Sequence, residues 1–242
     1  MSAVVPVHPE NPGSSRLLEL TLSACEIARS AAGKAADAMA SGNLDLLATI
    51  DHDERELDRI DQEMDEAAVF AITESTVREA RELLACMKFV IDLERIGDLL
   101  SSFAGRAAAV FPRIAQEDRE DFVRIATVLE QMIADARTAF LERDINRALS
   151  VLKADSVIDR LRNLIFIRHV EGSDGSATNQ GSIQVLFMAQ ALERAGDHAK
   201  NLGEEVCHYV SGRTVRHLSR SHDKPYEQLF IDWIREKQKL KL

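Results

Sequence analysis

Aromatic residues, proline and glycine are all scarce in this chain, which argues against a fold built from β-sheets and tight turns. Aromatic residues make up 5% of the 242 positions, with five prolines and eleven glycines. Good helix formers such as Leu, Ala, Glu and Arg are abundant instead. The composition therefore predicts an all-α fold with long helices.

Several functional classes lose support because their signatures are missing from the sequence. No apolar run approaches the ~18 residues of a membrane span, and residues 1–13, a Pro-rich segment expected to be a disordered lead-in, do not resemble a signal peptide. The three cysteines are scattered without a C-x-x-C pair, as expected for buried thiols in a reducing cytosol. No Ser-His-Asp set, Gly-rich phosphate loop or dinucleotide fingerprint is present. These absences leave the corresponding enzyme classes with little support.

Basic residues are outnumbered by acidic ones. The chain has 30 Lys and Arg against 40 Asp and Glu, a formal net charge of -10. Nucleic-acid binding requires a basic face, so we expect no nucleic-acid partner. An acidic chain suits contact with cations or with basic protein surfaces.

One hexapeptide occurs twice. Residues 93–98 read Leu-Glu-Arg-Ile-Gly-Asp, and residues 192–197 read Leu-Glu-Arg-Ala-Gly-Asp, 99 positions later. Both copies lie late in a long helical pattern. An acidic pair on the preceding helix repeats at an offset of 101, as Glu54 and Asp58 in the first half and as Asp155 and Asp159 in the second.

The helical pattern divides each half of the chain into three helices. We expect helices over about 14–40, 44–74, 76–110, 118–142, 145–170 and 183–210, with breaks at Ser41-Gly42-Asn43, at Phe111-Pro112 and in a polar loop over 171–182. The sequence thus predicts two tandem three-helix bundles related by internal duplication, over 14–112 and 118–217. We expect residues 218–242 to form a C-terminal extension with a short helix.

The repeated acidic pairs predict metal sites. Residues four apart share one face of a helix, so both carboxylates of each pair point the same way. A bundle that gathers several carboxylates is unfavourable unless protons or cations neutralise them. Oxygen ligands suit hard cations such as Mg²⁺, Mn²⁺, Ca²⁺ or Fe³⁺. The predicted ligands are Glu54, Asp58, Glu94, Asp98, Asp155, Asp159, Glu193 and Asp197.

Other interpretations of the motif stay open. Acidic pairs are common on solvated helices, where Arg95 and Arg194 would form ordinary surface ion pairs. Gly97 and Gly196 each cost about 1 kcal/mol inside a helix, which close approach by a neighbouring helix or by a metal's water shell would explain.

Two other protein classes fit parts of the pattern. A di-metal carboxylate oxidase needs two E-x-x-H motifs in one bundle, and the chain offers Glu205-x-x-His208. A helical scaffold without metal is the third interpretation.

With these motifs the chain resembles the PhoU family, the cytoplasmic accessory proteins of bacterial phosphate-specific transport. The resemblance extends from Ser15 to His217 and includes both hexapeptides, their acidic partner pairs and the ending Gly212-Arg213-x-Val215-Arg216-His217. It implies multinuclear clusters of a metal such as iron, zinc, magnesium or manganese. It also implies a regulator, and not an enzyme, that restrains phosphate uptake and the phosphate-starvation response. The implied partners are the transporter's ATPase subunit, a membrane sensor histidine kinase and a second copy of the chain.

The two motif copies differ in the residues after the last aspartate. Asp197 is followed by possible supporting residues for a bound cation at His198, Asn201 and Glu204, whereas the matching positions after Asp98 hold Leu99, Ser102 and Gly105. We therefore expect the second site to bind metal more tightly than the first.

Overall fold

The computed structural model describes residues 12–73, 76–171 and 180–211. This part of the chain is almost entirely helical: α1 (Pro12–Ser41), α2 (Leu44–Thr73), α3 (Val77–Val110), the 3-10 turn η1 (Phe111–Arg113), α4 (Gln116–Glu142), α5 (Ile145–Glu171) and α6 (Gln180–Ser211). The lead-in predicted over 1–13 lies outside the described residues except for Pro12 and Gly13, which belong to α1. The extension over 218–242 lies wholly outside them.

Helix bounds follow from local chemistry, and the predicted bounds agree with the structure to within three residues. Thr76 caps α3 through a capping box with Glu79, in which each side chain binds the other's backbone N–H. Gly42 ends α1 with a φ of +76°, a left-handed conformation that glycine adopts without a steric cost. Pro112 follows α3 within η1.

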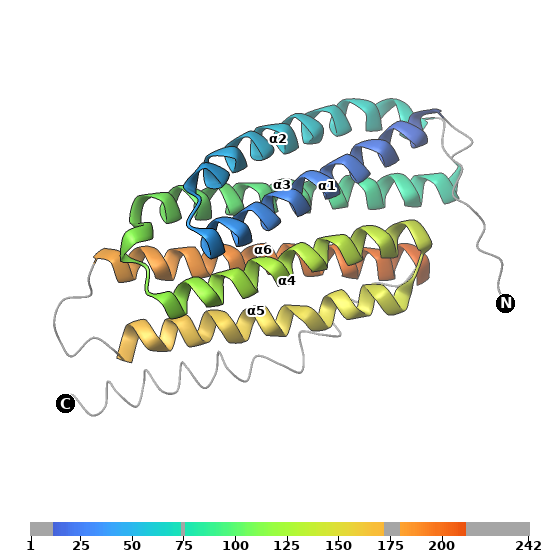
Figure 1. Cartoon of the computed structure of the whole chain (residues 1–242). Coiled ribbons are helices and arrows are strands. Elements are labelled where there is room, and N and C mark those ends of the chain that lie inside the picture. Colours follow the sequence, from blue (N-terminus) through green and yellow to red (C-terminus); the bar gives the residue numbers. More distant parts are fainter. Residues whose placement is uncertain (1–11, 74–75, 172–179, 212–242) are drawn as a thin grey trace, which may run out of the picture.

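The six helices form two three-helix units that pack side by side (Figure 1). Helices α3 and α6 make the most extensive contact in the molecule, and α1 packs against α4. Helix α2 packs on α1 and α3, and α5 packs on α4 and α6. The all-α fold of two tandem three-helix bundles is therefore confirmed, and each repeated hexapeptide lies on a central helix that faces its acidic partner helix.

The two repeats share one hydrophobic core. Along α1 the buried positions are mostly alanines, among them Ala28 and Ala35 with no exposed surface, and small side chains let helices approach closely. Aromatic rings also meet between the repeats, since Phe140 of α4 lies 4.7 Å from Phe89 of α3, measured between ring centroids. A single hydrophobic core therefore extends through both repeats.

A buried ionic network joins α4 to the end of α5. Asp118, with no exposed surface, accepts hydrogen bonds from Arg168 and from His169 Nε2, the latter at 2.9 Å. Arg168 also donates to Asp121 at 2.8 Å. Burial acts to raise the pKa of Asp118, but the hydrogen bonds and positive charges outweigh it and hold that pKa below its usual range.

Candidate metal centre

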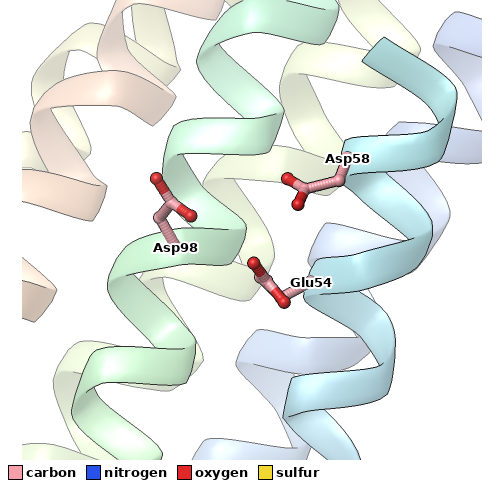
Figure 2. Close-up of side chains that lie close together, drawn as sticks. All are labelled: Glu54, Asp58 and Asp98. Atoms are coloured by element: carbon pink, nitrogen blue, oxygen red, sulfur yellow. The ribbon is translucent and has the colours of Figure 1, made fainter. Parts of the chain in front are cut away.

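Three predicted ligands of the first repeat meet between α2 and α3. Glu54 and Asp58 project from α2, and Asp98 projects toward them from α3 (Figure 2). One oxygen of each carboxylate lies within 4.8 Å of the others. Oxygens on opposite sides of one ion are about 4.2 Å apart for Mg²⁺ and about 4.8 Å apart for Ca²⁺, so this set fits around a single hard cation. It is the one such group of His, Cys, Asp or Glu side chains within the described ranges.

Gly97 positions this cluster by letting α2 approach α3. A Cβ at Gly97 would lie only 2.6 Å from Leu57 Cδ1, and the Leu57 side chain is buried in the core. Leu57 and Gly97 each directly precede one of the clustered aspartates in the chain, so their contact brings those aspartates together. The predicted close helix approach is confirmed, and a metal's water shell is not needed to explain the glycine.

Burial and repulsion between carboxylates both disfavour negative charge in the first cluster. Burial, followed by the charges of Asp58 and Asp98, raises the pKa of Glu54. Glu94 lies outside the three-oxygen group but is coupled to it, since burial and then the charge of Asp98 raise its pKa. The pKa of Asp61 is likewise raised, mainly by burial. Each of these carboxyl groups is therefore harder to ionise than the same group in water.

Arg95 partly offsets this charge from the rim of the cluster. Its guanidinium lies 3.3 Å from a Glu94 oxygen and 3.2 Å from an Asp98 oxygen, and its side chain is 57% exposed. The surface ion pairs considered for Arg95 are therefore present. Both ion pairs are with residues of α3, and Arg95 contributes none to Glu54 or Asp58 on α2.

The second repeat builds the same helix pair but a different site. Gly196 again allows close packing, since a Cβ there would lie 2.9 Å from Ile158 Cδ1. Around this contact lie the predicted ligands of α5 and α6, which are Asp155, Asp159, Glu193 and Asp197. The described residues give no three-oxygen group among these four carboxylates.

Two cationic side chains of the chain itself reach into the second cluster. Lys200 Nζ donates to Asp155, and Arg162 Nη2 lies 3.4 Å from Glu193. Burial acts to lower the pKa of Lys200, but Asp155, followed by Asp197 and Asp159, outweighs it and raises that pKa. The second cluster is thus paired internally, and its residues do not fit a metal as the first set does.

The three residues predicted to support a cation at the second site have other surroundings. His198 Nδ1 lies 2.7 Å from Asp92 on α3, and Asn201 Nδ2 donates to the same Asp92 oxygen at 3.0 Å. Glu204 is buried further along α6. The expectation of tighter metal binding at the second site depended on these side chains, and their contacts do not support it.

The single E-x-x-H motif also serves packing between the repeats. Lys88 Nζ of α3 donates to Glu205 at 3.0 Å, and His208 Nδ1 lies 3.4 Å from the same carboxylate. Glu205 is buried and ion-paired. This arrangement gives no support to the oxidase interpretation.

The fold and the site define a class of protein: a duplicated three-helix bundle with a carboxylate-lined contact between the second and third helices of each repeat. The family model of the PhoU domain matches residues 21–107 and 122–206. The chain therefore belongs to the PhoU family.

Similar proteins include a Thermotoga maritima "Phosphate-specific transport system accessory protein PhoU homolog 1". It is 30% identical over 168 residues, or 68% of this chain and 72% of that one. The Pseudomonas aeruginosa homolog is 32% identical over 181 residues, covering 70% of this chain and 72% of its own.

Two solved structures have the same fold. The crystal structure of PhoU from Pseudomonas aeruginosa matches with a TM-score of 0.78 at 23% identity, covering 85% of this chain and 100% of that one. The phosphate transport system regulatory protein PhoU from Streptococcus pneumoniae matches with a TM-score of 0.76 at 20% identity, covering 84% and 97%. In the described part of this chain, no helix is both long and apolar enough to cross a membrane.

Proposed function

We propose that this protein is a metal-binding cytoplasmic regulator of phosphate uptake and of the phosphate-starvation response. Its relatives are named as accessory or regulatory proteins of phosphate transport, and they share its duplicated helical fold. The proposed partners are the ATPase subunit of the phosphate transporter and a phosphate sensor histidine kinase. The proposal includes homodimers and no catalytic activity.

The observation that carries the metal part of this proposal is the convergence of Glu54, Asp58 and Asp98 in the first repeat. A bound cation would neutralise the negative charge that Arg95 offsets only from the rim of the cluster. The all-oxygen donor set favours magnesium, manganese or ferric iron over zinc, which more often takes nitrogen and sulfur ligands. Glu94, raised in pKa beside Asp98, would complete the coordination or orient Asp98.

Neutralisation of this cluster would change the surface that a partner meets. Asp98 is 42% exposed, and α2, which carries Glu54 and Asp58, lies on the outside of the bundle (Figure 1). With a cation bound, the carboxylates would hold α2 against α3 through one shared ion. We propose that the transporter and the kinase recognise this state of the α2–α3 face.

A binding assay tests the proposal. The transporter ATPase subunit and the cytoplasmic part of the sensor kinase would each be immobilised and exposed to wild type and to Asp58→Asn/Asp98→Asn, with Mn²⁺ present. The control Glu66→Gln/Glu142→Gln removes the same number of charges from exposed positions outside the cluster. We expect the control to bind like wild type and the cluster variant to bind at least ~10-fold more weakly.

Two results would count against the proposal. Failure of the wild-type protein to bind either component would argue against the proposed partners. Equal binding by wild type and the cluster variant would separate the metal centre from recognition and leave it a structural site.

A further inference from the structure

The internal duplication allows each position of the first cluster to be compared with its counterpart in the second. The offsets of 101 on the second and fifth helices and 99 on the third and sixth conserve the four carboxylate positions and the glycine. At two neighbouring positions the side-chain charge differs between the first repeat and the second. Asp61 becomes Arg162, and Ser101 becomes Lys200.

Both replacements place positive charge inside the second cluster. The side chains of Arg162 and Lys200 are only 16% and 26% exposed. Their carboxylate partners Glu193 and Asp155 are 7% and 5% exposed. Arg95 of the first repeat, by contrast, is 57% exposed and pairs at the rim.

Further acidic positions on α2 also have no acidic counterpart on α5. Asp51 and Asp65 correspond at the same offset to Leu152 and Phe166. The first repeat therefore adds negative charge along the whole α2 face around its cluster. The second repeat loses that charge and supplies its own cations.

The ammonium of Lys200 supplies positive charge to the carboxylates that a bound cation would need. It donates to Asp155 and interacts electrostatically with Asp197 and Asp159, three of the four predicted ligands. A metal ion could bind these carboxylates only by displacing the ammonium from a largely buried ion pair. Breaking such a pair leaves one charge uncompensated, which is costly.

We propose that Lys200, assisted by Arg162, is the built-in cation of the second repeat, so that this chain binds metal in its first repeat alone. The inference rests on the proposed metal binding by the first cluster. The α5–α6 contact is then held in one state by the chain itself. The α2–α3 contact alone responds to metal.

Metal stoichiometry tests the proposal through a graft between the repeats. Chelator-treated protein would be titrated with Mn²⁺, and bound metal would be measured by electron paramagnetic resonance and by elemental analysis after gel filtration. The variant Asp58→Asn/Asp98→Asn removes the first site, and Arg162→Asp/Lys200→Ser gives the second repeat the first repeat's residues. The reciprocal graft Asp61→Arg/Ser101→Lys places the two cations in the first repeat.

The expected results differ for each variant. Wild type binds Mn²⁺ at the first repeat alone, and Asp58→Asn/Asp98→Asn abolishes that binding. Adding Arg162→Asp/Lys200→Ser to this inactive background restores a binding event at the second repeat. The reciprocal graft weakens first-site binding at least ~100-fold, because two positive charges then lie within a few ångströms of the ion.

Residual Mn²⁺ binding by Asp58→Asn/Asp98→Asn that is lost on adding Asp155→Asn/Asp197→Asn would overturn the inference. Unchanged first-site affinity in the reciprocal graft would also overturn it, and that variant keeps the second repeat intact if the first graft fails to fold. If wild type binds no Mn²⁺ but the Arg162→Asp/Lys200→Ser graft does, the proposed metal function fails while the role of Lys200 stands. Circular dichroism confirms the fold of every variant.

Discussion

Neutralising matched carboxylates in the two repeats should have opposite effects on stability. Glu54 and Asp155 occupy equivalent positions, but Glu54 faces other carboxylates and Asp155 holds Lys200. We predict that Glu54→Gln stabilises the metal-free protein and that Asp155→Asn destabilises it. Each substitution exchanges one carboxylate oxygen for an amide nitrogen and leaves the side-chain size nearly unchanged.

The expected gain in stability for Glu54→Gln comes from the loss of repulsion between Glu54 and its two neighbouring carboxylates, whose oxygens lie within 4.8 Å. Two unit charges at such a distance repel by about 1 kcal/mol in a water-like medium and by several times more in a drier one. Side-chain rotation and Arg55, which lowers the pKa of Glu54, relieve part of this repulsion. We expect Glu54→Gln to raise the free energy of unfolding by about 1 kcal/mol, or the Tm by about 2–4 °C for a chain of this size.

The expected loss of stability for Asp155→Asn follows from the hydrogen bond that Asp155 accepts from the charged Lys200 ammonium. Such bonds contribute about 1.5–3 kcal/mol when buried, and the 26% exposure of the Lys200 side chain reduces that range through solvent screening. We expect Asp155→Asn to lower the free energy of unfolding by about 1–2 kcal/mol, with a Tm lower by about 2–8 °C.

Differential scanning calorimetry of chelator-treated protein at pH 7 measures both changes. Added salt should shrink the gain from Glu54→Gln more than the loss from Asp155→Asn, because exposed charges are screened more than buried ones. A destabilising Glu54→Gln, or shifts of the same sign in both variants, would refute the contrast between a repulsive first cluster and a paired second one.

Three other predictions concern packing, pH and thiols. Gly105→Ala should stabilise α3 by about 1 kcal/mol, because nothing lies within 4 Å of a Cβ at that position. Gly203→Ala should destabilise α6, because its Cβ would lie 3.0 Å from the backbone oxygen of Ala148. Urea unfolding of both variants measures the two changes. The pKa of Asp118 is lowered on folding, so its ionised form stabilises the fold above the ordinary pKa of 3.8, and this stabilisation is lost as pH falls through the lower folded value. The difference in free energy of unfolding between wild type and Asp118→Asn, measured with urea, should therefore shrink with acidification and not grow. The three cysteines are buried, and burial raises the pKa of Cys25 to about 12, so a disulfide reagent at pH 8 should label native protein far more slowly than unfolded protein, and rapid labelling of native protein would contradict this burial.

The helices were predictable from the sequence because their signals are local. The capping box at Thr76, the left-handed Gly42 and the helical spacing of apolar residues all depend on near neighbours in the chain. The duplication then related the two halves. It predicted that Glu54 and Asp58 would face Asp98, and the three carboxylates do converge in the structure.

The unpredicted part of the site depends on long side chains and on contacts between repeats. Helical periodicity gives the face of Lys200 but not the direction of its flexible side chain, so its pairing with Asp155 was missed. The signal that could have revealed it was the change from Ser101 at the equivalent position. His198 binds Asp92 of the other repeat, a contact that no pattern within one repeat could predict.

Whether the carboxylates of the first repeat form a metal site would be decided by an anomalous-scattering map from crystals grown with Mn²⁺. We predict a peak coordinated by Glu54, Asp58 and Asp98 and no peak at Asp155. A peak at the second cluster with none at the first, or equal peaks at both, would contradict this assignment.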